Sequence, residues 1–282
     1  MTSAKKWSEE AIRRLEIEGR GKGAAEHYLP WIMVHDISSR GRSRRVMGVK
    51  VRRPHHLLSD LEWQTFLHLE HCPSVVDIRE QFPLDRDITR ELAAVLGIHH
   101  PCYPGTHVPV VMTTDFLATR IIDGKQVFEA FDVKDDEAAE DDRVLAKLQL
   151  HRAYFEGMGM AHRLVFRSSI SKNIARNLEW ARQALCKPGE EEAYEGLLEE
   201  VARRIDSEFG AYSKRSLTLA DYCADFDFRH GYGRGTALRA AGQMIYVGRL
   251  RANLSNRDLH ACPLSSLYLS DPHDIWTGKE AA

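Results

Sequence analysis

The segment Thr114–Lys134 reads TDFLATRIIDGKQVFEAFDVK, and its central Asp123-Gly124 pair separates two runs rich in β-forming residues. An Asp-Gly pair between such runs predicts a β-hairpin with a two-residue type I′ turn. In that hairpin Ile122 faces Lys125, so the numbers of facing residues add up to 247. The sequence therefore predicts two long antiparallel strands whose pairing is fixed by the turn.

This register brings charged residues together at the open end of the hairpin. Asp115 faces Asp132 across the strands, at a Cβ–Cβ distance of about 4.5–5.5 Å. Lys134 lies two residues beyond Asp132 and therefore on the same face of its strand. Two carboxylates and an ammonium crowded on one face at a strand end are typical of a metal-dependent phosphodiesterase site.

A third carboxylate is expected from a helix further upstream. Ser59 and Glu62 have the spacing of a capping box, and apolar residues follow it, which predicts a helix over Ser59–His71. If Glu62 converges with the hairpin carboxylates, each pair at 4 Å repels by about 1 kcal/mol in water and about 4 kcal/mol at an effective dielectric of 20. Such a cluster requires a cation.

Magnesium fits this set of side chains because it is a hard ion that takes oxygen ligands and keeps several waters. One or two Mg²⁺ ions, with Mn²⁺ as a substitute, are expected on Glu62, Asp115 and Asp132. Lys134 cannot bind metal as an ammonium. It is instead expected to hold the attacking water or to offset charge that builds on the phosphate.

Each of these residues also has a structural interpretation. Glu62 is the capping-box glutamate whether or not it binds metal. Asp115 and Lys134 are placed to form a salt bridge, and Asp132 begins an acidic run that ends at Asp142. The combination of all four residues, with two of them aligned by a hairpin, is more specific than any one of them.

The order of predicted elements indicates a mixed α/β domain followed by a mostly helical one. In the first part we expect helices at 8–19, 59–71, 87–96 and 137–158, and strands at 75–82, 108–122, 126–134 and 161–166. In the second part we expect helices at 173–185, 190–208, 217–226 and 235–241, and a strand at 243–249. Helices followed by a strand with basic flanks suggest a winged-helix-like module. The predicted domains are 1–168 and 169–282.

The distribution of charge is more informative than its sum, since the 282-residue chain carries a formal charge of only −2. Two segments, Arg40–Arg53 and Arg229–Arg257, hold cations and no acid. Basic segments away from an acidic site suit a protein that grips phosphates at its edges. The residues expected to contact DNA are Arg40, Arg42, Arg44, Arg45, Lys50, Arg52, Arg53, Arg234, Arg239, Arg249 and Arg251. The alternative is that these segments are solvated faces.

The remaining composition excludes several classes of protein. The five cysteines form no C-x-x-C pair, which argues against a zinc ribbon and against a disulfide framework. The pairs His55-His56 and His99-His100 lack the i,i+4 spacing of zinc-binding helices. No apolar run reaches about 18 residues, and the polar stretch Met1–Arg14 does not look like a signal peptide. A soluble protein of the bacterial cytosol, with no membrane contact, is expected.

Ordered sequence blocks over about the first 180 residues resemble the TnsA endonuclease family. They are Glu18-Gly-Arg-Gly-Lys-Gly23, Tyr28-Leu-Pro-Trp31, Gly41-Arg-Ser43, His55-His-Leu-Leu-Ser-Asp-Leu-Glu62, Asp77-Ile-Arg-Glu-Gln-Phe-Pro-Leu84, Thr113-Thr-Asp-Phe116, Asp132-Val-Lys134 and Asn177-Leu-Glu-Trp180. The resemblance becomes weaker beyond the last block. Proteins of this family work with the TnsB transposase in heteromeric cut-and-paste elements, including CRISPR-associated ones.

The resemblance implies a restriction-endonuclease-like N-terminal domain that binds magnesium. It also implies cleavage of the 5′ strands at transposon ends, while TnsB cuts and joins the 3′ ends. Glu62, Asp115 and Lys134 match the family's catalytic positions, whereas Asp132 stands where some relatives carry Gln. The family's C-terminal domain engages DNA and the AAA+ regulator TnsC. TnsB, TnsC and double-stranded DNA are therefore the expected partners.

The sequence therefore predicts a Mg²⁺-dependent DNA endonuclease subunit of a transposase. A stand-alone restriction or junction-resolving nuclease on the same fold is the enzymatic alternative. The alternative that is not an enzyme is a DNA-binding adaptor, whose carboxylates only cap helices and pair with cations.

Overall fold

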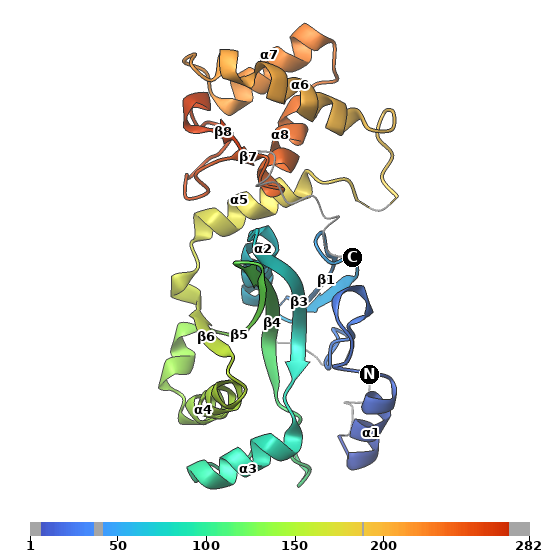
Figure 1. The fold of residues 1–282 in the computed structure, drawn as a ribbon, viewed down its shortest axis with the longest axis vertical. Helices are drawn as coiled ribbons and strands as arrows, with labels where there is room; N and C mark the ends of the chain where they lie inside the picture. Colours follow the sequence, from blue (N-terminus) through green and yellow to red (C-terminus); the bar gives the residue numbers. More distant parts are fainter. Residues whose placement is uncertain (1–6, 37–41, 188, 271–282) are drawn as a thin grey trace. The chain divides into compact units, whose positions relative to one another are not determined.

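A computed structural model describes residues 7–36, 42–187 and 189–270 of the chain (Figure 1). The chain forms two compact units, and the boundary between them in the sequence lies between Ile170 and Ser171. The first unit is mixed α/β and the second is mostly helical. Within the described ranges, every helix is too short or too polar to cross a lipid bilayer.

A four-stranded mixed sheet forms the centre of the first unit (Figure 1). Its strands lie in the order β3, β4, β5, β6, with β3 to β5 antiparallel and β6 parallel to β5. The bounds are Val75–Pro83 for β3, Thr113–Ile122 for β4, Lys125–Lys134 for β5 and Ala161–Phe166 for β6. Sequential strands are thus neighbours throughout, as is usual in small sheets.

The β4–β5 hairpin has the predicted turn and the predicted register. Asp123 and Gly124 have φ angles of 51° and 73°, and a type I′ turn needs positive φ at both of these positions. The paired residues run from Ile122–Lys125 to Phe116–Phe131. The strands therefore keep the register that the Asp-Gly pair predicts as far as Phe116.

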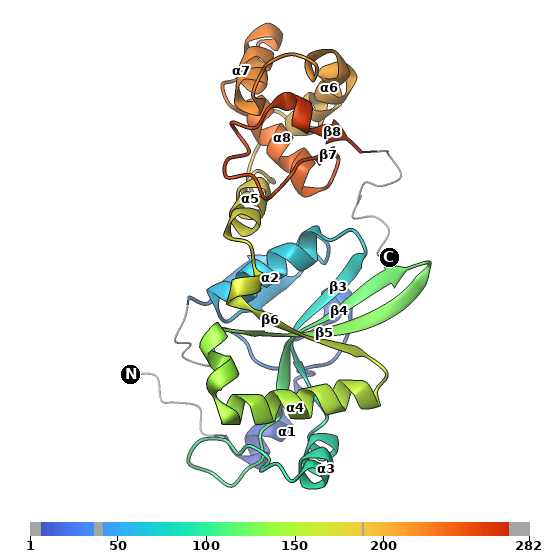
Figure 2. The same ribbon diagram turned by 90° about the vertical axis from the view of Figure 1, so that its left-hand side faces the viewer.

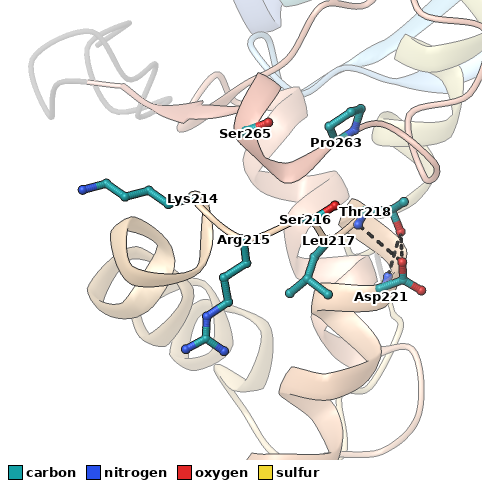
Figure 3. Close-up of a pocket in the computed structure, with 8 residues that line it drawn as sticks. All are labelled: Lys214, Arg215, Ser216, Leu217, Thr218, Asp221, Pro263 and Ser265. Atoms are coloured by element: carbon teal, nitrogen blue, oxygen red, sulfur yellow. Dashed lines mark hydrogen bonds between the residues drawn. The ribbon is translucent and has the colours of Figure 1, made fainter.

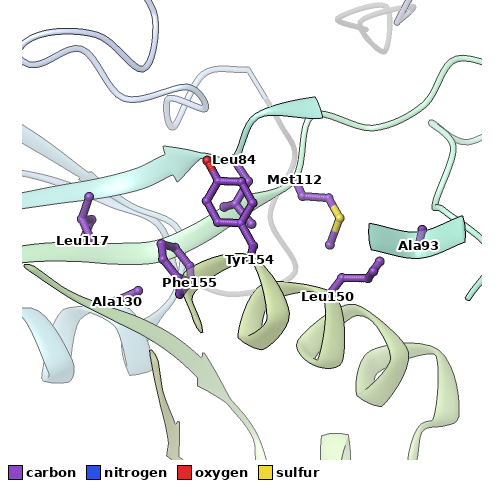
Figure 4. Close-up of a cluster of buried hydrophobic side chains, with 8 residues drawn as sticks. All are labelled: Leu84, Ala93, Met112, Leu117, Ala130, Leu150, Tyr154 and Phe155. Carbon is purple, nitrogen blue, oxygen red and sulfur yellow. The ribbon is translucent and has the colours of Figure 1, made fainter. Parts of the chain in front are cut away.

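Two helices cover opposite faces of this sheet (Figure 2). They are α2, Asp60–His71, and α4, Asp142–Gly157. Leu117 and Ala130 face each other across the hairpin and share the face that α4 covers, where they form a buried apolar cluster with residues of that helix (Figure 4). The other buried members of this cluster are Leu84, Ala93, Met112, Leu150, Tyr154 and Phe155.

Smaller elements surround the sheet. Helix α1, Glu9–Ile17, is capped by Ser8 and buries Ile12 and Leu15 in a second apolar cluster. Strands β1, Arg44–Met47, and β2, Pro54–Leu57, form an antiparallel pair. Helix α3 spans Arg86–Leu96, and the 3₁₀ turns η1, η2 and η3 span Ala25–His27, Asp136–Glu140 and Arg167–Ser169. The predicted helix at 137–158 is therefore a 3₁₀ turn followed by α4.

Where the structure describes it, the second unit contains four helices and a short strand pair. The helices are α5, Lys172–Gln183, α6, Leu197–Tyr212, α7, Leu219–His230, and α8, Thr236–Tyr246. Helix α8 packs against the other three. Strands β7, Leu250–Arg251, and β8, Tyr268–Leu269, pair antiparallel, and the 3₁₀ turn η4 spans Leu264–Ser266.

The predicted strand at 243–249 is wrong, because α8 continues to Tyr246. Residues of α8 are buried at the 3–4-residue spacing of one helical face: Ala237, Ala240, Ala241, Met244 and Ile245. Burial of this apolar face outweighs the β-preference of the sequence Met-Ile-Tyr-Val. The chain leaves the helix at Gly248, whose φ is 78°.

Two residues expected to contact DNA lie in the interior of the first unit. Arg53 is only 4% exposed and binds the Glu80 carboxylate with both terminal nitrogens, at 2.8 and 2.6 Å. Lys50 is also buried, and its ammonium donates to the backbone carbonyls of Cys72 and Val75. Burial lowers the pKa of Lys50 to about 8. Neither side chain is available to a phosphate, so their predicted role in DNA contact is not supported by where they lie.

The Arg53–Glu80 pair gives a first prediction, on stability. Arg53→Met should destabilise the fold by about 3–5 kcal/mol, because it leaves the fully buried Glu80 carboxylate without its main cation. Arg52→Met is the matched control, since the neighbouring Arg52 is exposed and should change stability by less than about 0.5 kcal/mol. Urea unfolding measures both, and equal midpoints for the two variants would contradict a buried, structural Arg53.

Candidate active site

Strands β4 and β5 separate beyond the Phe116–Phe131 pair. There side chains of β4, instead of its backbone, form the hydrogen bonds to the backbone of β5. The Thr114 hydroxyl donates to the Phe131 carbonyl at 2.9 Å, and Asp115 Oδ2 accepts from the Val133 backbone N–H at 2.6 Å. Meanwhile β5 stays paired with β6 as far as Lys134. The result is a fork between two strands with Asp115 inside it.

Lys134 completes one side of this fork. Its ammonium donates to Asp115 Oδ2 and to the Val133 carbonyl, each at 3.0 Å. Burial would lower the pKa of Lys134, but the negative charges of Asp115 and Asp132 outweigh burial and raise it. Lys134 is therefore a stable ammonium beside a carboxylate, as both the catalytic and the salt-bridge interpretation require.

Glu62 reaches the same place from the first turn of α2. Ser59 Oγ accepts from the Glu62 backbone N–H at 3.1 Å, which is one half of the predicted capping box. The Glu62 carboxylate departs from that motif, because it accepts from the Leu58 N–H at 2.8 Å and from the Ser59 hydroxyl at 3.1 Å. Glu62 thus caps its helix and is still close enough to Asp115 and Lys134 to feel their charges. We call Glu62, Asp115 and Lys134, at the fork between β4 and β5, the acidic fork.

The Glu62 carboxyl is poorly compensated in the absence of a cation. Burial and then repulsion from Asp115 raise its pKa to about 8, against partial offsets from its hydrogen bonds and from Lys134. The side chain is only 7% exposed. A buried carboxyl that repels a neighbouring carboxylate is a group that a hard divalent ion would neutralise, because such an ion takes oxygen ligands. These residues fit such an ion.

Asp132, the second predicted hairpin carboxylate, lies against two histidines that were not among the predicted site residues. Asp132 Oδ2 accepts from His151 Nδ1 of α4 at 2.5 Å and from His162 Nε2 of β6 at 2.7 Å. Burial would raise the pKa of Asp132, but the charge of His151 and both hydrogen bonds lower it below the usual range. Sequence spacing offers no signal for this trio, because its members come from three separate elements.

Gln81 of β3, which was not among the predicted site residues, also lies beside the fork. It lies between residues paired with Phe116 and Thr114, and therefore opposite Asp115. Its side-chain amide is 3.4 Å from Glu62 Oε2. Its φ of 48° is left-handed, a conformation that non-glycine residues hold at a cost and that clusters at functional sites. A lone Gln in a strand carries no sequence signal for this.

The comparisons with known proteins agree with this geometry. Residues 72–166 match the family described as "TnsA-like endonuclease N terminal". A stretch of 174 residues is 43% identical to "Transposon Tn7 transposition protein TnsA" of Escherichia coli, and it covers 62% of this chain and 63% of that protein. The chain is thus similar to TnsA over this stretch. It spans a little under two thirds of the length of this relative.

The residues that match the TnsA-like endonuclease domain include three of the four predicted site residues. Asp115, Asp132 and Lys134 lie within residues 72–166, whereas Glu62 lies ten residues before them. The histidines His151 and His162 also fall inside the match. The family domain therefore covers all four strands of the sheet and α4, but not α2.

The other basic residues expected to contact DNA differ in exposure. Arg42, Arg45, Arg52 and Arg234 are exposed, and Arg40 lies outside the described residues. Several of the rest form ion pairs: Arg44 with Asp60, Arg239 with Glu190, and Arg249 with Glu199 and Asp206. Arg251 donates to the hydroxyl of Ser270. Those ion pairs would have to open before the arginines could bind phosphate.

An open pocket of about 370 Å³ in the second unit lies at the start of α7 (Figure 3). Lys214 and Arg215 line it, but its one carboxylate, Asp221, is engaged in the capping box with Thr218. Tyr212 lies under the Arg215 guanidinium, 4.2 Å from ring centroid to Cζ. The pocket has the charge of a phosphate contact and no side-chain constellation for catalysis.

The raised pKa of Glu62 gives a second prediction. Its folded-state pKa of about 8 exceeds the ordinary 4.5, so the folded protein holds this proton more tightly than the unfolded chain. Stability without metal should therefore fall as pH rises from about 5 to 8, on the order of 1 kcal/mol per unit. Glu62→Gln should remove this loss, and be more stable than wild type at pH 8 but not at pH 5.

Urea unfolding in EDTA at both pH values measures this difference. Glu91→Gln, which removes one exposed carboxylate, controls for the change in net charge. Equal stability of Glu62→Gln and wild type at pH 8 would show that the Glu62 carboxyl is not strained in the metal-free protein.

Proposed function

We propose that this chain is the endonuclease subunit of a heteromeric transposase and cuts the 5′, non-transferred strands at transposon ends. The observation that carries the proposal is the convergence of Glu62, Asp115 and Lys134 at a fork in the sheet, in a chain that is similar to TnsA. The acidic fork supplies the chemistry, and the family supplies the setting in transposition.

In this proposal Glu62, Asp115 and Asp132 hold the metal. Asp115 is fixed by the Val133 N–H and by Lys134, so one of its oxygens is oriented before any ion binds. Glu62 is held by Leu58 and Ser59 in the same way. Preorganised carboxylates lose little conformational freedom on binding, which favours a precise coordination geometry.

The expected ion is Mg²⁺, as one or two ions, with Mn²⁺ as a substitute. When bound, such an ion would lower the pKa of an attacking water and stabilise charge on the phosphate and the departing oxygen. Lys134 is the only one of the four residues that carries positive charge. Its ammonium would orient the water or balance the charge that develops on the phosphoryl oxygens.

In this proposal the first unit has a restriction-endonuclease-like fold. The second unit is a winged-helix-like module, with β7 and β8 as a small wing. The exposed Arg42, Arg45, Arg52 and Arg234 are the first candidates for contact with double-stranded DNA. TnsB and the AAA+ regulator TnsC are the proposed protein partners, and the bacterial cytosol is the proposed location. Catalysis would belong to the first unit, and binding of DNA and partners to the second.

One observation favours a second candidate, a DNA-binding adaptor. Asp115 and Lys134 form a direct ion pair at 3.0 Å, which by itself would explain both residues without catalysis. The raised pKa of Glu62 speaks against this candidate, because an adaptor has no need of a strained carboxyl beside that pair.

A cleavage assay decides between the two candidates. Asp115→Ala and Lys134→Ala should each lower cleavage of transposon-end DNA at least about 100-fold, in the presence of Mg²⁺ and both partner proteins. Arg163→Ala is a matched control, because Arg163 lies on neighbouring β6 and pairs with Glu129 outside the acidic fork. Nicks should map to the 5′ strand ends. Nicks only at 3′ ends, or full activity of both variants, would refute the proposal.

A further inference from the structure

We propose that His151 and His162 are positioning residues that clamp one oxygen of Asp132 and thereby present its other oxygen to the metal ion. The inference rests on the proposed function, because it assumes that Asp132 is a metal ligand. It assigns a role to two residues outside the fork between β4 and β5.

The clamp is assembled from three elements. Asp132 lies near the end of β5, His151 on α4 and His162 on the adjacent strand β6. Hydrogen bonds of 2.5 and 2.7 Å join both imidazoles to the same atom, Asp132 Oδ2. The Asp132 side chain is only 1% exposed. Both contacts are thus made in the interior, where such bonds are strongest.

The two carboxylate oxygens of Asp132 differ in their hydrogen-bond partners. Oδ2 receives two N–H donors, which is the normal capacity of one carboxylate oxygen. Oδ1 is buried and, among the residues that the structure describes, no donor reaches it. A buried carboxylate oxygen without a partner costs free energy unless something binds it. The unpaired oxygen is therefore the one that a cation would bind.

The rings of the clamp are held by their own packing. His162 stacks on Phe155 of α4, with ring centroids 5.6 Å apart and planes at 24°. The two imidazoles pack edge to face, with ring centroids 6.1 Å apart. His162 also pairs with Ala130 in the β5–β6 ladder, which fixes its backbone beside Asp132. Each imidazole therefore meets Asp132 with one defined nitrogen, Nδ1 from His151 and Nε2 from His162.

The distances distinguish a clamp from a second metal centre. The same three side chains could in principle bind an ion directly, since their ligand atoms lie within 4.8 Å of one another. Ligands that share a tetrahedral zinc ion at 2.0 Å are about 3.3 Å apart, however. The observed 2.5 and 2.7 Å are hydrogen-bond distances. In this arrangement both imidazoles bind the Asp132 carboxylate directly.

The identity of the donating nitrogen leads to a specific test. The side-chain nitrogen of Asn occupies nearly the position of a histidine Nδ1, and that of Gln occupies nearly the position of Nε2. His151→Asn and His162→Gln should therefore keep the clamp, whereas the crossed variants His151→Gln and His162→Asn should break it. Partners that orient a metal ligand typically contribute 10–100-fold to affinity.

The readout is Mn²⁺ binding to the full chain in the absence of DNA, measured by electron paramagnetic resonance of the free ion. We expect wild-type affinity for the two matched variants and an affinity about 10–100-fold weaker for the two crossed ones. Arg152→Ala, next to His151 on the exposed side of α4, is the control and should bind as wild type. Circular dichroism checks that each variant is folded.

Three results would overturn the clamp, and they have different meanings. If Asp132→Asn weakens Mn²⁺ binding but all four histidine variants bind as wild type, the clamp is wrong and the proposed endonuclease stands. If wild type binds no Mn²⁺, the proposed function fails with it. If Co²⁺ gives a tetrahedral absorption spectrum that every histidine variant abolishes, the trio is itself a metal centre.

Discussion

One oxygen atom, Asp115 Oδ2, determines the architecture of the site. It accepts the Val133 N–H in place of a backbone carbonyl and at the same time receives the Lys134 ammonium. The first contact lets β4 and β5 separate without leaving a buried donor unpaired. The second keeps an ammonium beside the carboxylate. The fork that faces Glu62 depends on both, since a continuous ladder would close it.

Two buried glutamates of the first unit show how differently the fold treats a carboxylate. Glu80 is fully buried, yet Arg53, His55 and the His56 N–H all bind it, and its pKa stays below the usual range despite burial. Glu62 is buried without such a cation, and its pKa is raised to about 8. A chain that compensates one carboxylate so completely leaves the other poorly compensated, which is the pattern expected where a metal ion belongs.

Much of the fold could be predicted because local patterns decide it. The Asp-Gly turn fixes the hairpin register, and Ser59 marks the start of α2. The prediction failed where tertiary burial overrides local preference. Residues 243–246, with β-forming side chains, are helical because α8 buries its apolar face against three other helices. The sequence predicts that Lys50 and Arg53 belong to a basic surface. They are buried instead, because backbone carbonyls bind Lys50 and Glu80 binds Arg53.

The sequence by itself determined the pairing of β4 with β5. Its hairpin register, capping box and family resemblance together led to Glu62, Asp115, Asp132 and Lys134 as the proposed site residues. These follow from a turn, a cap and ordered blocks, which are local in the chain. Only the tertiary structure decided that β4 and β5 separate at Asp115, and that Gln81, His151 and His162 join the site. Those contacts join residues 18 or more positions apart, and side-chain hydrogen bonds at such separations have no periodicity that a sequence can display.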